Sequence, residues 1–276
     1  MIRRVLAAVI ILLVLAIRFA TPVAAQTPIL PENSVVNAAS FVPFGQPGHA
    51  MAPGSIVTIF GSNFASALLV GSTIPLSTSL GGVSIAFNGT IPGPFYFVLQ
   101  EQLGAQLPAG LSGSTATIVV RNASGSSATR TLQIAPTSPS IFTTPAGGAG
   151  QGIVTFALDP TVFAAVPSMM LPNARPARVG DFLIIYANGL GATQPAVPDG
   201  AAAPVTEPLA RTVATPVVTL GGVSCPVLFS GRVPGLVGLD QINIQVAIGV
   251  TPGNAVPLQI SLGGVTSSNL VTIAVQ

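Results

Sequence analysis

Apolar and polar side chains alternate along most of the chain after residue 34. The clearest runs are 116–121, 242–247 and 256–262, where a Val, Ile, Leu or Ala side chain occupies every second position. A period of two with many β-branched residues is typical of a strand that buries one face. Residues 182–186 are apolar at every position, which predicts a central strand covered on both faces.

Turn signals separate these runs. Asn88-Gly89, Pro252-Gly253-Asn254 and Gly263-Gly264 are dipeptides or tripeptides of the kind that close β-hairpins. Helix signals are poor, because only 161–170 has room for a short helix and Pro167 interrupts it.

Several segments recur in the same order in two halves of the chain. Residues 54–60 match 180–186, and Leu-Gly-Gly-Val-Ser stands at both 80–84 and 220–224. The separation between the copies grows along the chain, which indicates an insertion in the second copy between 190 and 214. Repeats longer than about 50 residues point to tandem domains rather than to a solenoid.

Short strands with turn signals between them predict an all-β protein. We expect two tandem immunoglobulin-like β-sandwiches, at 34–137 and 138–276, because such domains need about seven strands and roughly 100 residues each. The join at 135–140 contains two prolines, so we expect a short, semi-rigid connection.

The first 25 residues have the pattern of a signal peptide. Arg3 and Arg4 precede the apolar run 5–17, and Val23-Ala24-Ala25 places small residues at a cleavage site. An apolar run of this length makes only about 20 Å of helix, short of the roughly 30 Å hydrocarbon core of a membrane. We therefore expect cleavage before Gln26, export from the cell, and no stable membrane span afterwards.

Charge is scarce, at 6% of residues against roughly 25% in an average globular protein. Three of the nine basic residues lie in the leader, which leaves six arginines against seven acidic residues. This balance offers no basic patch for a run of phosphates, so nucleic-acid binding is disfavoured. Lysine is absent, and scarce charge leaves sheet edges either open to pairing or guarded by Thr, Ser, Pro and bulges.

Eight segments of the chain resemble those of a known family. They are Val36–Phe41, Ala52–Gly61, Leu80–Val83, Pro139–Thr143, Arg178–Asp181, Tyr186–Gly191, Gln241–Val246 and Thr251–Pro257. With these segments the chain resembles the Solibacter-type C-terminal domain family of secreted acidobacterial proteins. Each copy is also similar to the IPT/TIG type of immunoglobulin-like domain. These resemblances imply a sandwich fold and an extracellular adhesive or spacer role, and they bring no catalytic residues.

Catalysis needs titratable groups that converge on one place, and the sequence offers few. His49 is the only histidine and lies in a loop of Gly and Pro, which favours a solvated side chain over a catalytic one. Glu101 and Asp240 occupy corresponding regions of separate copies, so a shared glycosidase site would require the copies to face each other. Cys225, the only cysteine, lies in an apolar strand and is expected to be a small buried hydrophobe.

Binding motifs for metals and cofactors are also missing from the sequence. No His, Cys or Asp cluster has the spacing of a metal site. The glycine-rich segment 148–152 resembles a phosphate loop only superficially, because a strand is predicted after it. The sequence therefore predicts no catalytic, cofactor-binding or metal-binding residues, and no enzyme.

We expect a non-catalytic, secreted or cell-surface module for structure or protein interaction. Its expected partner is a cell-envelope protein or a polysaccharide, and its contacts come from loops and strand edges, the insertion at 190–214 first among them. We expect deletion of that insertion to spare folding.

The alternative is a carbohydrate-binding module, weakened by the absence of Trp and by Tyr96 and Tyr186 standing inside apolar strands. A hydrolase is the third hypothesis.

Overall fold

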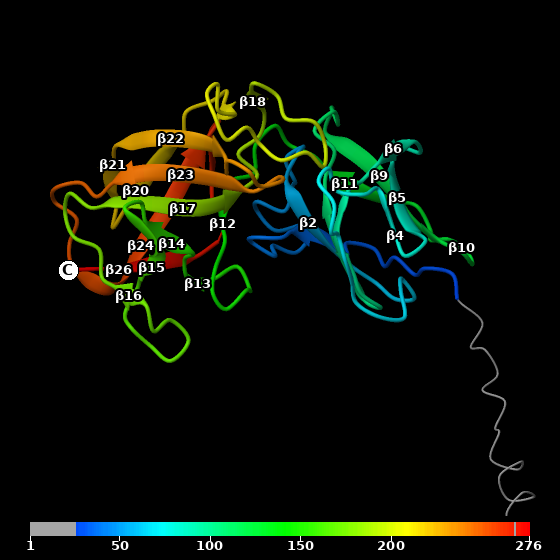
Figure 1. Cartoon of the computed structure of the whole chain (residues 1–276), viewed down its shortest axis with the longest axis horizontal. Helices are drawn as coiled ribbons and strands as arrows, with labels where there is room; N and C mark the ends of the chain where they lie inside the picture. The colour runs from blue at the N-terminus through cyan, green and yellow to red at the C-terminus, as the bar shows by residue number, and fades with distance from the viewer. Residues whose placement is uncertain (1–25, 268) are drawn as a thin grey trace, which may run out of the picture.

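The computed structural model describes residues 26–267 and 269–276, which form strands, turns and loops. Four sheets are present, two built from the first half of the chain and two from the second. The two halves lie side by side along the long axis of the molecule (Figure 1). Within these described ranges no helix has the length and apolarity needed to cross a membrane. The predicted signal peptide, residues 1–25, lies outside the described residues.

The first half contains a five-stranded and a six-stranded sheet. The five-stranded sheet has the order β1 (Val35–Asn37), β2 (Ile56–Phe60), β8 (Gln102–Gln106), β7 (Phe95–Val98), β3 (Leu69–Val70). The other has the order β10 (Gly125–Ser126), β9 (Thr115–Asn122), β5 (Val83–Phe87), β4 (Ser79–Leu80), with β11 (Arg130–Gln133) on β9 and β6 (Ile91–Pro92) on β5.

The second half contains a nine-stranded and a six-stranded sheet. The larger has the order β16 (Ala174–Arg175), β15 (Asp159–Ala164), β14 (Val154–Phe156), β17 (Phe182–Asn188), β23 (Asp240–Gln245), β22 (Val227–Arg232), β19 (Arg211–Thr212), β18 (Thr193–Gln194), with β12 (Ser140–Ile141) on β17. The smaller has the order β13 (Gly150–Gln151), β26 (Val271–Val275), β24 (Gly253–Leu262), β20 (Val217–Leu220), β21 (Val223–Cys225), with β25 (Val265–Thr266) on β24.

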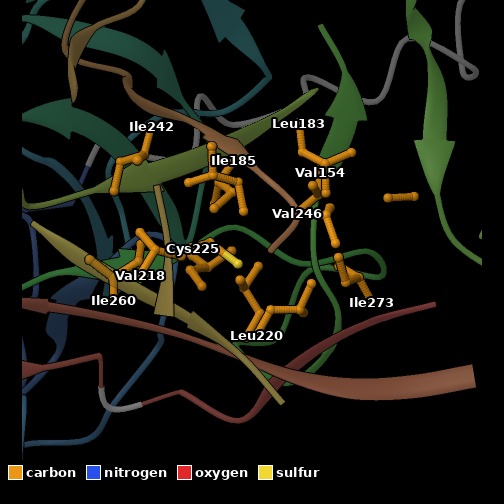
Figure 2. Close-up of a cluster of buried hydrophobic side chains, with 14 of the residues drawn as sticks. Val154, Leu183, Ile185, Val218, Leu220, Cys225, Ile242, Val246, Ile260 and Ile273 are labelled. Carbon is orange, nitrogen blue, oxygen red and sulfur yellow. The ribbon is translucent and has the colours of Figure 1, made fainter. Parts of the chain in front are cut away.

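Each pair of sheets encloses its own apolar core. In the second half, alternate residues of β17, β23 and β24 point inward, and Ile185, Ile242 and Ile260 are fully buried (Figure 2). A separate cluster fills the first half, with Phe87 and Phe95 at its centre. Burying such a side chain contributes about 1.5–3 kcal/mol. The chain is thus an all-β protein of two tandem immunoglobulin-like sandwiches, as the alternation predicts.

The repeated Leu-Gly-Gly-Val-Ser segment forms the same turn in both halves. Gly81 and Gly82 have φ of 61° and 78°, and Gly221 and Gly222 have 60° and 82°. The strands around the turn are nevertheless used differently. In the first half the strand after the turn, β5, pairs with the long strand β9, whereas in the second half the strand before it, β20, pairs with β24.

Three local expectations need correction. Residues 161–170 do not form a helix, because 161–164 continue strand β15 beside β14 and the chain then loops through Pro167. The predicted turn at 252–254 is instead the start of β24, and the chain turns earlier, at Gly249. Strand β17 is central, but its outer face is only partly covered, since Phe182 is 41% exposed.

The strands at the ends of the four sheets are only two or three residues long. They are β1 and β3, β10 and β4, β16 and β18, and β13 and β21. A very short edge strand presents few unpaired backbone groups to another chain. Short edge strands therefore protect most of these sheet edges without the lysines that usually guard them, the exception being the four-residue strand β11 on β9.

Asp181 holds the start of β17 through an ion pair. Its carboxylate accepts hydrogen bonds from Arg175 Nη1 and from the Arg178 N–H, both at 2.8 Å. Partial burial raises the pKa of Asp181, but the hydrogen bonds from Arg175 and Arg178 outweigh it and hold that pKa below its usual value. Because the pKa of Asp181 is lower in the folded chain than in the unfolded one, its interactions stabilise the fold above the unfolded pKa of about 3.9. This stabilisation is lost as the pH falls through the folded-state pKa.

Asp181→Asn is expected to lower the free energy of unfolding by about 1 kcal/mol at pH 7, because the pair is partly exposed. The difference from wild type is expected to vanish in strong acid, below both pKa values. Urea denaturation followed by circular dichroism at a series of pH values measures it. Glu101→Gln, at an exposed carboxylate, is the control, and a pH-independent loss in Asp181→Asn contradicts the electrostatic explanation.

Cys225 is 4% exposed on β21, which confirms the expectation of a buried thiol. We predict that iodoacetamide labels it slowly in the native chain and completely in urea, because access requires local opening. Intact-mass spectrometry follows the reaction. Val205→Cys, at a 70% exposed position, is expected to add one rapidly labelled thiol. Equal labelling rates at the two positions would contradict burial of Cys225.

Candidate functional site: the joint between the two halves

Buried polar side chains from both halves interlock where the sandwiches meet. Asn188, at the end of β17, is fully buried and reaches the backbone of Ile56 at the start of β2. Its Oδ1 accepts the Ile56 N–H at 2.9 Å, and its Nδ2 donates to the Ile56 carbonyl oxygen at 2.8 Å. The amide thus pairs with Ile56 as a neighbouring strand would, across 132 residues of sequence.

Asn37, on β1, bonds to the same amide from the first half. We call the network of Asn37, Ser140, Asn188 and the Ile56 backbone the amide lock. Its Oδ1 accepts hydrogen bonds from Asn188 Nδ2 at 2.8 Å, from Ser140 Oγ at 2.9 Å and from the Ala39 N–H at 2.9 Å. Asn37 and Asn188 are both 1% exposed or less. A buried network with its partners satisfied in one arrangement specifies that arrangement, because any other leaves polar groups unpaired.

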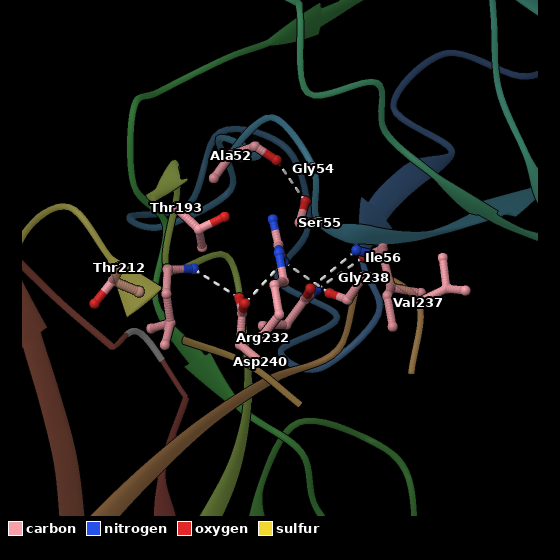
Figure 3. A network of polar contacts seen from close by, with 12 residues as sticks. Ala52, Gly54, Ser55, Ile56, Thr193, Thr212, Arg232, Val237, Gly238 and Asp240 are labelled. Carbon is pink, nitrogen blue, oxygen red and sulfur yellow. Dashed lines mark hydrogen bonds and ion pairs between the residues drawn. The ribbon is translucent and has the colours of Figure 1, made fainter. Parts of the chain in front are cut away.

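An ion pair lies beside the amide lock, fully inside the joint. Arg232 Nη1 lies 2.7 Å from Asp240 Oδ1, and the two side chains are 7% and 0% exposed (Figure 3). The second carboxylate oxygen accepts the Leu190 N–H at 3.0 Å. Burial raises the pKa of Asp240, and the Arg232 guanidinium and the Leu190 N–H act in the opposite direction.

The insertion at 190–214 contacts the first half directly. Asp199 Oδ1 accepts the Ala109 N–H at 2.8 Å, and the Gly200 N–H donates to Gln106 Oε1 at 2.7 Å. The Gly200 carbonyl oxygen accepts the Leu76 N–H at 2.8 Å. This segment is therefore part of the joint rather than a free contact loop. Deletion of residues 199–200 would remove these hydrogen bonds from Ala109, Gln106 and Leu76, and the expectation that the deletion spares folding stays a prediction.

Two further side chains of the first half close the joint. Tyr96 Oη donates to the Val237 carbonyl oxygen at 3.0 Å, and burial raises the pKa of Tyr96. Gln106 Nε2 donates to the Gly54 carbonyl oxygen at 3.3 Å while its Oε1 holds Gly200. Tyr96 is thus half-buried, and its hydroxyl is bonded across the joint.

Glycine is required where the backbones approach most closely. Gly189 has φ of +79°, and a Cβ there would lie 2.2 Å from the Ser138 carbonyl oxygen. Gly148, in the segment that superficially resembles a phosphate loop, would place a Cβ 1.9 Å from the Ser40 carbonyl oxygen. Strand β14 (Val154–Phe156) follows the segment 148–152, as predicted, and Gly148 packs on the first half.

The residues considered for catalysis do not meet. His49 is half-buried, with Nδ1 2.7 Å from the Gln46 carbonyl oxygen and its ring edge-on to Phe44 at 4.9 Å. Glu101 is exposed, whereas Asp240 is buried in the joint and paired with Arg232. Across residues 26–267 and 269–276, no three His, Cys, Asp or Glu side chains gather as metal ligands would.

No family model matches the chain, and no curated protein sequence matches it. Among solved structures, SGBP-B from a complex xyloglucan utilization locus in Bacteroides uniformis is 14% identical with a TM-score of 0.27, covering 90% of this chain and 50% of that one. Domains 5–6 of the S-layer protein SbsC are 12% identical with a TM-score of 0.26, covering 90% and 99%.

The plexin A4 extracellular region is 12% identical with a TM-score of 0.24, and the match covers 94% of this chain and 16% of that one. This chain thus spans half of the SGBP-B structure and a smaller part of the plexin structure. With TM-scores this low, none of these similarities carries a functional argument.

Sequence reasoning singled out Asp240, Tyr96 and the insertion at 190–214 for other roles, and it missed Asn37, Asn188 and Arg232. One signal was available for Arg232 and Asp240. They are two of very few charges in the chain, eight positions apart in apolar strands, which is where an unpaired charge is costly. Asn188 gave no such signal, because its partner Ile56 lies in the other half.

Proposed function

We propose that the chain is a non-catalytic, secreted or cell-surface module for structure or protein interaction, in which the two sandwiches act as one rigid unit. The amide lock carries the proposal. Neighbouring domains move relative to each other by default unless their interface prevents it. Here Asn188 and Asn37 satisfy each other and the Ile56 backbone in a single arrangement.

A rigid pair of sandwiches suits a role in which two surfaces must keep a set distance and angle. Such a unit presents loops of both halves together, as an interaction surface or a spacer requires. The second half also reaches back through residues 199–200 to hold the first. These contacts stabilise one orientation of the two halves. Independent binding domains joined by a flexible tether would not need such contacts.

We also propose that the chain belongs with the Solibacter-type C-terminal domains that it resembles. The segments that carry the resemblance include Val36–Phe41, Ala52–Gly61, Pro139–Thr143 and Tyr186–Gly191. Each of these four segments contributes one residue to the amide lock. In the order of the segments, these residues are Asn37, Ile56, Ser140 and Asn188. A shared joint is a physical reason for such a set of segments to recur together.

Surface proteolysis of intact cells tests the location on which the proposal depends. The full-length chain, with a C-terminal tag, is expected in the medium or on the cell surface, where added protease removes it. The matched control lacks residues 2–25 and is expected to stay inside the cell. Retention of the full-length chain in the cytoplasm would overturn the proposal.

An activity screen tests the non-catalytic part separately. The purified chain is expected to leave ester and glycoside substrates unchanged. Turnover that co-purifies with the chain, and that falls when His49 or Glu101 is replaced with alanine, would favour the hydrolase hypothesis instead. His49→Ala and Glu101→Ala change side chains outside the joint, so folding is expected to be unaffected.

A further inference from the structure

The joint contains a pocket of about 280 Å³ whose walls come from both halves. Most of its lining is small or apolar, with Leu111, Pro136, Ala196 and Val197 among the residues on its walls. Ligand sites in proteins span roughly 300–1,000 Å³, so this pocket lies just below that range and has room only for a very small molecule. Among the residues that the structure describes, Arg232 is the only charged side chain that lines it.

Arg232 is 6% exposed, yet part of its hydrogen-bonding capacity is unused. Its Nη1 donates to the Gly238 carbonyl oxygen at 2.8 Å and to Asp240 Oδ1 at 2.7 Å. Within the described part of the chain, nothing accepts a hydrogen bond from its Nε or Nη2. A guanidinium carries five N–H donors and stays charged at any ordinary pH, so Nε and Nη2 keep donors that a ligand in the pocket can use.

The local backbone makes room for this guanidinium. A Cβ on Gly54 would lie 2.5 Å from Arg232 Nη2, so only glycine allows the side chain to stand where it does. Figure 3 shows Arg232 reaching from Asp240 toward Gly54 and Ser55 of the first half, with one nitrogen free of any dashed line. Asp240 therefore occupies Nη1 of the guanidinium, and Nε and Nη2 are available at the pocket.

We propose that this pocket binds a small aliphatic monocarboxylate through the free donors of Arg232. A carboxylate matches the paired donors of a guanidinium, which bind its two oxygens in parallel. Asp240 already balances the charge of Arg232, so every negative charge of a ligand adds to the site uncompensated, and a single carboxylate is the least costly anion there. The Leu, Pro, Ala and Val walls fit a short apolar tail.

Titration of the ¹⁵N-labelled purified chain with sodium butyrate tests the proposal, and butyramide is the neutral probe of the same shape. Butyrate is expected to shift the amide signals of Gly191, Ala192 and Gly238 saturably. Butyramide is expected to bind about ten-fold more weakly, because it cannot form the charge-assisted pair. Absence of saturable shifts with butyrate, or equal affinity for butyramide, would overturn the proposal.

Variants locate the binding site. Ala196→Phe, at an exposed wall position, is expected to fill the pocket and weaken butyrate binding about ten-fold or more. Val205→Phe lies in the same insertion away from the pocket and is expected to bind as wild type does. Arg232→Lys keeps the charge but loses the paired donors, and about ten-fold weaker binding is expected.

Unchanged butyrate affinity in Ala196→Phe or in Arg232→Lys would place the ligand elsewhere and refute this site. The amide spectrum of each variant reports its fold in the same experiment. The proposed role as a rigid extracellular module is tested by the location of the chain and by the relative orientation of its halves. Its test is therefore independent of butyrate binding.

Discussion

Arg232→Met lowers the free energy of unfolding at pH 7 by about 3–5 kcal/mol, because it leaves Asp240 buried without its counter-ion. Asp240 is fully buried, and Nη1 of Arg232 lies 2.7 Å from its carboxylate. Without the guanidinium, nothing opposes the effect of burial on the Asp240 pKa except the backbone N–H groups of Gly189 and Leu190.

The loss is expected to depend on pH with a defined sign. Burial raises the pKa of Asp240, and removal of Arg232 raises it further. Because the pKa of Asp240 is higher in the folded chain than in the unfolded one, the free energy of unfolding is retained below the unfolded pKa of about 3.9. It falls as the pH rises through the folded-state pKa. The variant is therefore expected to be closest to wild type near pH 4 and furthest from it at neutral pH.

Urea denaturation at a series of pH values measures this prediction. Arg211→Met is the matched control, since Arg211 pairs with Glu207 at 2.9 Å on the surface, where an ion pair contributes about 1 kcal/mol or less. A loss below about 1 kcal/mol in Arg232→Met would show that the buried pair does not stabilise the joint.

Asn188→Ala is expected to lower the free energy of unfolding by about 1–3 kcal/mol and to uncouple the two halves. The substitution leaves the part-buried Ile56 N–H without its acceptor, a loss of about 1–3 kcal/mol, whereas the Ile56 carbonyl keeps the Ala38 N–H and Asn37 Oδ1 keeps Ser140 and the Ala39 N–H. The cores of the two sandwiches are separate, so each half keeps its own stability.

Scanning calorimetry tests this second prediction through the shape of the transition. Wild type is expected to unfold in one transition and Asn188→Ala in two, one for each sandwich. Asn254→Ala, at an exposed position, is the control and is expected to match wild type within about 0.5 kcal/mol. A single unshifted transition in Asn188→Ala would mean that the amide lock does not couple the halves.

The sequence predicts the sandwiches well because strand periodicity is a local property. The alternation at 256–262 corresponds to β24, and the three Gly-Gly turns at 81–82, 221–222 and 263–264 have the left-handed φ values that favour glycine. The pairing beyond each turn was not predictable. A hairpin turn determines that two strands are adjacent but not which of them joins the rest of the sheet, and β5 and β20 differ in this.

The joint was out of reach of sequence reasoning for a different reason. Asn188 lies next to Gly189 and looks like a turn residue, whereas its buried amide pairs with a backbone 132 residues away. The insertion likewise looked like a surface loop, because Pro, Ala and Gly suit an exposed segment. Its contacts at Asp199 and Gly200 depend on where Gln106 and Ala109 stand in the other half.

Residual dipolar couplings measured on backbone amides of both halves in one alignment medium test the rigid joint most directly. We predict that the couplings of residues 35–133 and of residues 140–275 fit a single alignment tensor when both halves are placed as in this structure. Two tensors of different magnitude or orientation, obtained from the same sample, would contradict the account, because they would show that the sandwiches reorient independently.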